Sequence, residues 1–303
     1  MASPRNTIGG LDINRTDICY TRCLPDSRLI ANVCIQPLEI DADDYWGAVN
    51  SAFDDFLKEF KIPGENIVSS LPGEYAIIKK IVLESDENNI DDTIEWELSQ
   101  QIIGSLDDYV YDYQRLTDIS EKAVQNFLVV GYRNSAIDRI TKLLKSKKLN
   151  PIIIDLDIFA LINVYEINYD DKISMPALII FSDTVRTKLI LTVNGSFIDI
   201  EVFDHTEDIQ TLEDFMSILD ENIKKLLEYN TGFGDITSIS NYLTGSYFSK
   251  PEMVEAVLGK VKNCEVLFPF RKITCSAGMD DEKLREFSPQ LAVSVGLALR
   301  DID

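Results

Sequence analysis

The chain has 303 residues, with 29 Lys and Arg against 51 Asp and Glu and a formal net charge of -22 at pH 7. This charge repels nucleic-acid phosphates and anionic lipid, so neither DNA or RNA binding nor direct membrane insertion is expected. Hydrophobic residues make up 45% and charged residues 26%, which excludes a disordered chain and indicates a globular protein of about two domains.

The sequence also predicts the compartment. It contains no run of about 18 apolar residues, and its first thirty residues lack the pattern of a signal peptide. Its five cysteines are odd in number and widely spaced, which favours free thiols in a reducing compartment. Cys19 and Cys23 lie on one face of a predicted strand and are expected to pack in the core rather than bind zinc. We therefore expect a cytoplasmic protein.

The first seventy residues predict a sheet with a covering helix. Three alternating apolar segments read as an antiparallel meander, at 6–14, 17–24 and 28–37. Residues 41–61 have apolar side chains at helical spacing, and 66–70 form a further strand.

The following residues predict an inserted α+β unit of about 75 residues. Its expected strands are 75–83, 108–116, 123–132 and 151–157, and its expected helices are 91–103 and 135–147. A further helix begins at Phe159 and extends to Tyr165.

After a boundary at 170–172, the opening pattern repeats. The expected strands are 175–181, 187–194, 197–203, 238–244 and 265–268, and the expected helices are 212–229, 251–261 and 289–300. Asn194-Gly195 predicts a tight hairpin turn. The meander and helix thus occur twice, at 6–70 and 175–244, which indicates a duplicated fold with a ligand cleft between two similar lobes.

The residue inventory offers little catalytic material. His205 is the only histidine, in an acidic stretch that predicts a solvated loop, so a multi-His metal site and a Ser-His-Asp triad are not expected. No phosphate-loop motif occurs, and Gly232-Phe-Gly234 follows a predicted helix, where it reads as a helix end and turn. We predict no catalytic residue and no metal ligand.

Several short motifs occur in the order found in one family. They are Leu71-Pro72-Gly73, Ile94-Glu95-Trp96-Glu97 with Gln100-Gln101, Asp112-Tyr113-Gln114, Val129-Val130-Gly131-Tyr132-Arg133, the run 149–155 and the tail 289–300. Together they make the chain resemble the PilM family of type IV pilus assembly proteins over essentially its whole length.

This resemblance implies a fold class and a domain division. The fold is α/β, an actin-like (ribonuclease H-like duplicated) two-lobed fold with an inserted α+β subdomain as in FtsA. Residues 1–73 with 158–172 would form the first lobe, and 74–157 the inserted subdomain. Residues 173–303 would form the second lobe, with a C-terminal helix that returns toward the first.

The resemblance also implies a function. Family members bind ATP between the lobes and bind the short cytoplasmic tail of a bitopic inner-membrane protein, PilN, in a ring beneath the pilus machine. The cytoplasmic region of GspL is a secretion-system relative with the same fold. We therefore expect a cytoplasmic scaffold held at the inner membrane by a PilN-like partner, with self-association into a ring as a further expectation.

The nucleotide-binding turns depart from the family pattern. Asp12 matches the family acid, but Asn14 stands where glycine is expected and is followed by Arg15 and Thr16. The second turn aligns with Phe181-Ser182-Asp183-Thr184, which lacks both the acid and the glycine, and only Gly245 remains of the adenosine-side glycines. Side chains at these positions obstruct the approach of phosphate.

These changes leave alternatives open. We expect no cofactor, with ATP and Mg²⁺ as the alternative if Arg15, Arg186 and Lys188 contact phosphates directly. In the simpler interpretation these three residues are a solvated turn. The alternative function is an active ATPase, either a switch or a filament protein, and a sugar or acetate kinase is less well supported.

The family's tail-binding groove lies between the first lobe and the inserted subdomain. The residues carried over to that groove by position are Ile77, Ile78, Trp96, Ile102 and Ile103. The acidic surface is expected to favour a basic tail.

Overall fold

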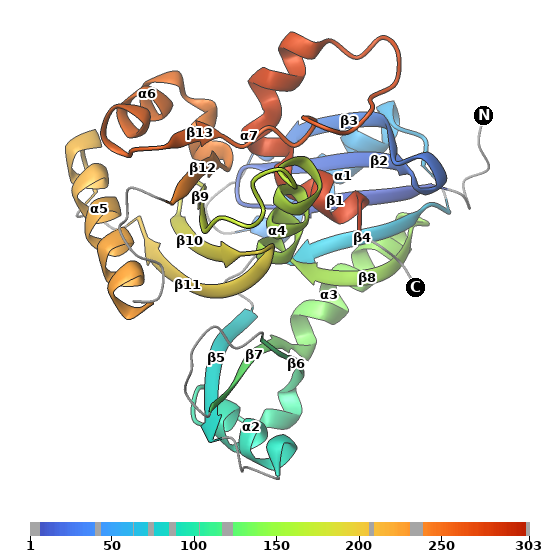
Figure 1. Ribbon diagram of the computed structural model, residues 1–303. Coiled ribbons are helices and arrows are strands. Elements are labelled where there is room, and N and C mark those ends of the chain that lie inside the picture. Colours follow the sequence, from blue (N-terminus) through green and yellow to red (C-terminus); the bar gives the residue numbers. More distant parts are fainter. Residues whose placement is uncertain are drawn as a thin grey trace.

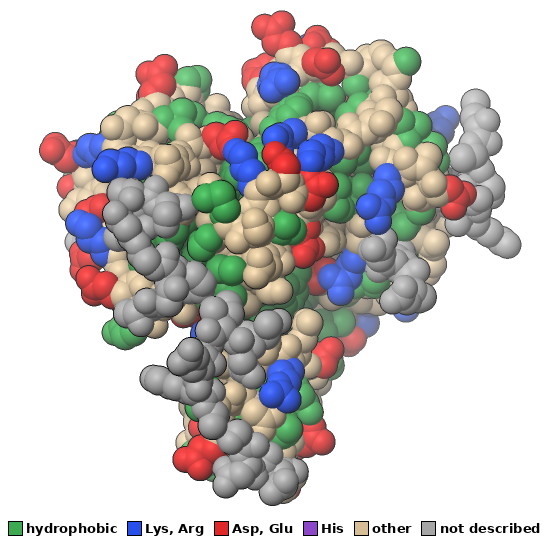
Figure 2. All heavy atoms as spheres, viewed as in Figure 1, with side chains coloured by type: hydrophobic (Ala, Val, Ile, Leu, Met, Phe, Trp, Pro, Cys, Tyr) green, Lys and Arg blue, Asp and Glu red, His purple; other side chains and the backbone are tan. Residues whose placement is uncertain are grey.

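The computed structural model describes residues 7–39, 44–62, 64–71, 76–84, 89–102, 104–116, 124–205, 209–230 and 239–300. Two lobes lie side by side, and a smaller unit projects from the first of them (Figure 1). Basic and acidic side chains are interspersed across the face seen in Figure 2, in spite of the large negative net charge.

The first lobe is built on a five-stranded sheet in the order β3-β2-β1-β4-β8. Its strands are β1 (Ile8–Ile13), β2 (Asp17–Leu24), β3 (Leu29–Pro37), β4 (Asn66–Leu71) and β8 (Asn150–Leu156). The first three form the predicted antiparallel meander, and β4 and β8 add to it in parallel. Cys19 and Cys23 are buried free thiols, as predicted.

The second lobe repeats this strand order as β11-β10-β9-β12-β13. Its strands are β9 (Ala177–Ser182), β10 (Arg186–Val193), β11 (Ser196–Asp204), β12 (Ser240–Thr244) and β13 (Cys264–Val266). Asn194 and Gly195 both have positive φ, 52° and 73°, which confirms the predicted tight hairpin. The same order in two sheets confirms the duplicated, two-lobed fold class.

Helices cover both sheets and fill the space between them. They are α1 (Tyr45–Glu59), α3 (Asn134–Ser146), α4 (Asp157–Asn168), α5 (Leu212–Tyr229), α6 (Pro251–Lys260) and α7 (Asp281–Ala298). The largest apolar core joins α1, α3, α4 and α7 to the first sheet and to one face of the second. A separate core packs α5 and α6 on the other face of the second sheet.

The inserted unit has its own sheet, in the order β5-β7-β6. Its elements are β5 (Ala76–Glu84), α2 (Ile90–Ser99), β6 (Tyr109–Arg115) and β7 (Val124–Arg133). The predicted division assigned 74–157 to this unit, but the last strand, β8, pairs with β4 in the first lobe. The correction has a simple cause, because a continuous apolar strand fits any buried parallel position and carries no signal of its partner.

The C-terminal helix differs from the prediction at its start. We expected it to begin at Pro289, but α7 begins eight residues earlier, at Asp281. Asp280 caps it by accepting the N–H groups of Glu282 and Lys283. Pro289 lies inside the helix and has no N–H for the Arg285 carbonyl, which the Ser288 hydroxyl bonds instead at 2.8 Å.

Two glycines allow α7 to pack directly against its neighbours. A Cβ on Gly10 of β1 would lie 2.0 Å from the Ser294 carbonyl oxygen, and one on Gly296 would lie 1.9 Å from that of Ala160 in α4. These contacts are between backbones, which cannot move aside as a flexible side chain can. The layer formed by α4 and α7 therefore fixes the spacing of both sheets.

We predict that Gly296→Ala lowers the free energy of unfolding by about 2–3 kcal/mol, because the added methyl group must separate α7 from α4. Chemical denaturation of the whole chain measures this. Gly259→Ala is the matched control, since it also lies in a helix but meets nothing within 4 Å, and it should stabilise the protein by up to about 1 kcal/mol. Equal stability of the two variants would contradict the proposed role of the contact.

Candidate functional site

Two corresponding hairpin turns face each other between the lobes. One joins β1 to β2 at 14–16, and the other joins β9 to β10 at 183–185. With Asp12, Asp157 and Lys188 they line a cavity of about 20 Å³, which we call the interlobe site. Pockets for small molecules usually occupy roughly 300–1,000 Å³, so this space suits a water molecule and not a nucleotide.

Each turn uses its own side chain to bond its backbone amides. The Asn14 Oδ1 atom accepts the N–H groups of Thr16 and Asp17, both at 2.9 Å. In the second lobe, the Asp183 Oδ1 atom accepts those of Val185 at 2.7 Å and Arg186 at 2.8 Å. The amides that could otherwise bind an anion are therefore already bonded within the chain.

Asp12 lies beneath the first turn. It is buried, and it accepts the Ser70 hydroxyl at 2.6 Å and the Asn14 amide at 3.1 Å. Burial raises the pKa of this carboxyl to about 6, and the two hydrogen bonds only partly offset that effect.

A buried ion pair crosses the interlobe site. Lys188 of the second lobe donates from Nζ to Asp157, the first residue of α4, and both residues are less than 10% exposed. This corrects the interpretation of Lys188 as part of a solvated turn. Sequence patterning could not reveal the pair, because a strand lysine is expected to face solvent unless a partner from another element covers it.

Most of the other residues of the predicted nucleotide site make contacts within the chain. Arg186 pairs with Asp204 at 3.0 Å, and Arg15 lies 5.6 Å from the Tyr45 ring centre. Gly245 has a φ of 101° and donates its N–H to the Pro289 carbonyl of α7 at 2.8 Å. Thr184 is exposed at the tip of the second turn. The structure thus brings the two turns together, whereas Gly245 is bonded to α7.

His205 differs from its prediction as a solvated loop residue. Its ring is half-buried, its Nε2 atom lies 2.8 Å from the Thr187 hydroxyl, and it packs on Phe215 and Tyr247. Burial lowers the pKa of its imidazole. The acidic neighbours in sequence gave no sign of this aromatic contact, which α5 and the segment after β12 supply.

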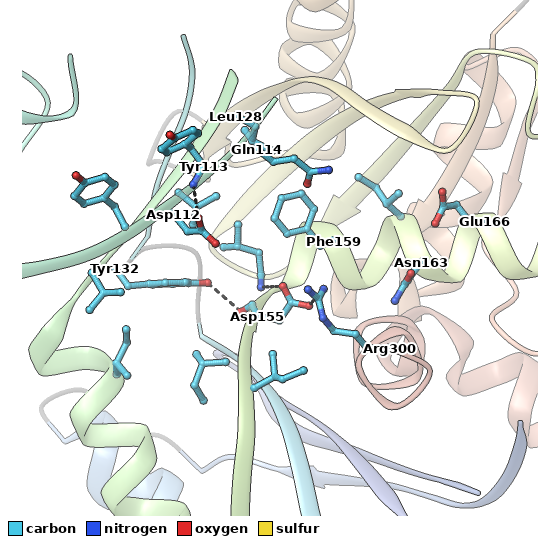
Figure 3. A pocket seen from close by; sticks show the side chains of 18 residues that line it. Asp112, Tyr113, Gln114, Leu128, Tyr132, Asp155, Phe159, Asn163, Glu166 and Arg300 are labelled. Atoms are coloured by element: carbon cyan, nitrogen blue, oxygen red, sulfur yellow. Dashed lines mark hydrogen bonds and ion pairs between the residues drawn. The ribbon is translucent and has the colours of Figure 1, made fainter. Parts of the chain in front are cut away.

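A larger pocket of about 450 Å³ lies where the inserted unit meets the first lobe (Figure 3). We call it the junction groove. Its walls come from β6, β7, β8 and α4, with Arg300 after the end of α7. The face of the inserted sheet that lines it is the one α2 does not cover, since α2 packs on the opposite face through Ile94 and Leu98.

The groove combines apolar walls with a few charged groups. Leu128, Val130 and Phe159 are among the apolar lining residues. At one end the guanidinium of Arg300 pairs with Asp155, and the Tyr132 hydroxyl donates to the Asp155 carbonyl at 3.0 Å. Burial raises the pKa of Asp155 although Arg300 opposes the shift. Such a surface fits an extended peptide better than a small polar molecule.

The residues predicted to bind a partner lie mainly elsewhere. Ile78 is on the groove-facing side of β5, opposite Val130, whereas Ile77 packs on the α2 side. Trp96 is 60% exposed on α2, and Ile102 follows that helix. Ile103 lies outside the described residues, as does the predicted turn at 232–234.

The sequence did contain a signal for the groove. Four of the motif stretches that carry the family resemblance contribute lining residues, namely Asp112-Tyr113-Gln114, 129–133, 149–155 and the tail ending at Arg300. Sequence reasoning used them only to recognise the family. Their convergence on one pocket became visible once the strands were paired.

Comparisons with known proteins define the class. Across 96% of this chain and 97% of the other, the structure matches a chain of the PilM-PilN type IV pilus biogenesis complex, with a TM-score of 0.79 and 16% identity. A Bacteroides thetaiotaomicron protein with an actin-like ATPase fold and unknown function matches over 94% and 96%, with a TM-score of 0.51 and 9% identity. The ethanolamine utilization protein EutJ from Carboxydothermus hydrogenoformans matches over 98% and 90%, with a TM-score of 0.50 and 10% identity. The chain therefore has an actin-like fold.

The comparison with protein-family models covers a shorter part of the chain than the structural comparison. Residues 29–177 match the family described as type IV pilus assembly protein PilM, which confirms the predicted resemblance to the PilM family. None of the curated proteins matches the chain. Within the described part of the chain, no helix is long and apolar enough to cross a bilayer.

The buried Asp12 carboxyl predicts a pH dependence. Its folded pKa of about 6 exceeds the unfolded value of 3.8, so ionised Asp12 destabilises the fold, by about 3 kcal/mol above pH 7. This destabilisation decreases as the pH falls through 6 and disappears below 3.8.

We therefore expect Asp12→Asn to remove about 1 kcal/mol of the difference in unfolding free energy between pH 5 and pH 7.5. Urea denaturation at the two pH values tests this. Asp26→Asn, at an exposed site, is the control and should leave the difference unchanged. An identical pH dependence in wild type and Asp12→Asn would show that Asp12 is not the group responsible.

Proposed function

We propose that this protein is a scaffold of a type IV pilus or related secretion machine. In this proposal it binds the cytoplasmic tail of a PilN-like inner-membrane partner in the junction groove. The observation that carries the proposal is the position of the family match. Residues 29–177 include every residue that lines the groove except Arg300.

Most of the interlobe site lies outside the residues that match the family. Asp12, Asn14, Asp183 and Lys188 all lie outside the matched residues. The sequence features shared with the PilM family therefore concentrate at the peptide-sized groove rather than at the two turns. This distribution supports partner binding as the main role of the protein.

The groove also has suitable dimensions and chemistry for a tail. Its volume of about 450 Å³ accommodates a few side chains of an extended segment. Val110 on β6 is 55% exposed at the groove, so an apolar residue is available to a ligand without prior unfolding. Covering this apolar side chain with apolar groups of a ligand is favourable. A partner tail would thereby hold the protein at the cytoplasmic face of the inner membrane.

We further propose that the interlobe site binds no nucleotide. Three observations support this part of the proposal: the cavity of about 20 Å³, the self-bonded turns, and the Lys188–Asp157 pair. The pair places a positive charge from one lobe against a negative charge from the other. The lobes are then held together by the chain's own side chains, and the ATPase alternative is the less well supported of the two functions.

The tail-binding proposal predicts the effect of a charge in the groove. The probe is a synthetic peptide with the cytoplasmic tail sequence of the PilN-type protein from the source organism, and fluorescence anisotropy measures its binding to the whole chain. Val110→Glu should weaken binding at least tenfold, about 1.4 kcal/mol, because the introduced carboxylate would lose its hydration where apolar side chains of the tail pack against β6.

Trp96→Ala is the matched control. Trp96 is exposed to a similar extent in the same inserted unit, but on the helix that covers the opposite face of the sheet. It should leave the affinity unchanged. If the control weakens binding and Val110→Glu does not, the tail lies on the α2 side and the assignment of the groove is wrong.

A second prediction concerns nucleotide. Isothermal calorimetry of the wild-type protein with ATP and Mg²⁺, beside a chelator control, should give no binding heat, and ATP should leave the thermal midpoint unchanged. A micromolar dissociation constant, about -8 kcal/mol, would require the interlobe site to open and would restore the switch hypothesis.

A further inference from the structure

The junction groove lies between two unpaired sheet edges. Among the residues that the structure describes, β6 pairs only with β7 and β8 pairs only with β4, so each of these strands has one side without a strand partner there. Both strands line the groove with consecutive residues, Val110–Gln114 from β6 and Ile153–Leu156 from β8. Consecutive lining residues mean that the groove meets the edge of each strand and not merely one face, because side chains alternate between faces.

The hydrogen-bond pattern identifies the groups on the free side of β6. The Leu116 N–H donates to the Asn126 carbonyl of β7 at 2.8 Å. In an antiparallel pair, bonded residues alternate with residues whose N–H and C=O groups point away from the partner. Tyr111 and Tyr113 therefore direct their backbone groups to the free side.

A carboxylate covers one of the N–H groups on the free side of β6. Asp112 accepts the N–H of Tyr113 at 2.8 Å through its own Oδ1 atom (Figure 3). Asp155 does the same for Leu156 on β8, also at 2.8 Å. Natural proteins protect exposed sheet edges with charged side chains, so Asp112 occupies a position that another strand could take.

The two edges differ in how firmly they are held. Asp155 is buried, its other oxygen pairs with Arg300, and its carbonyl accepts the Tyr132 hydroxyl. Asp112 is exposed and, within the described ranges, has no cationic partner. Displacing Asp112 therefore breaks one exposed hydrogen bond, whereas displacing Asp155 breaks a buried network. The edge of β6 is the one available to a ligand.

The charges around the groove indicate the ligand's sign. Asp112, Asp155 and Glu166 face it, with Arg300 as the cation. Arg300 is already paired with Asp155, and Glu166 is half-buried with no ion-pair partner among the residues that the structure describes. With Asp155 paired and Asp112 bonded to the edge of β6, Glu166 is the carboxylate available to a basic side chain of the ligand.

We propose that the occupant of the junction groove is an extended segment with a basic residue, which adds as a strand to the free edge of β6. The Tyr113 N–H then donates to a carbonyl of that segment in place of the Asp112 carboxylate, and Glu166 pairs with the basic side chain. This inference rests on the proposed function, since it describes how the partner tail would be recognised.

Backbone methylation of the tail peptide tests the strand addition. Each backbone N–H is replaced in turn by N-methyl, and binding to the whole protein is measured by fluorescence anisotropy. A strand bonded along one edge should lose at least tenfold in affinity at every second residue and little at the residues between.

Asp112→Ala should bind the unmodified peptide several-fold more tightly, because no carboxylate has to be displaced. Asp138→Ala, at an exposed site on α3, is the control and should not change the affinity.

Glu166→Gln tests the charge pairing. It should weaken binding of the natural tail several-fold but leave a peptide with norleucine in place of the basic residue unaffected. If the peptide binds but the affinity losses caused by N-methylation do not alternate from residue to residue, the strand addition is overturned and the proposed function stands. Equal losses for both peptides overturn the Glu166 contact. Failure of the unmodified peptide to bind would overturn the proposed function as well.

Discussion

The close contact of α7 with β1 and α4 is the constraint on which the rest of the architecture depends. At Gly10 and Gly296 no side chain separates the backbones, so the central helices lie as near to the first sheet as their main chains allow. The same helix reaches the second lobe, where the Pro289 carbonyl accepts the N–H of Gly245 and the hydroxyl of Thr244. One helix thus fixes the first sheet, the second sheet and their separation.

This spacing decides the state of the interlobe site. With the lobes held close, Lys188 from β10 reaches Asp157 at the start of α4, and the two turns leave room for about one water molecule. A buried lysine would be strongly destabilising without its partner, and so would the aspartate. The ion pair and the helix packing are therefore mutually dependent, since the first requires the geometry that the second imposes.

The junction groove follows from a different feature, the insertion of a half-covered sheet. A three-stranded sheet has two faces, and in the described part of the inserted unit the helix α2 covers one of them. The chain joins this sheet to the first lobe through α3 and β8, which places the uncovered face opposite α4. The groove is therefore lined by apolar residues that neither unit can bury alone. Partner binding at this position uses surface that the topology leaves open.

Local pattern determined much of the fold. Alternating apolar residues gave the two meanders, the Asn194-Gly195 dipeptide gave its hairpin, and the repetition of these elements gave the duplicated two-lobed class. The family resemblance aligned the turns at Asn14 and Asp183, which lie around one small cavity between the lobes. Ordered motifs, each too short to identify a family alone, gave the resemblance to PilM proteins.

Tertiary structure decided what depends on contacts distant in sequence. The assignment of β8 to the first sheet, the burial of Lys188 and the packing of His205 all depend on partners in other elements of the fold. So does the groove, which collects residues from 110 to 300. A sequence records the period and polarity of each element, but the partner of an element is set by how all the apolar faces can be buried at once. The pairing of elements is therefore determined by the tertiary structure and not by the sequence of any one element.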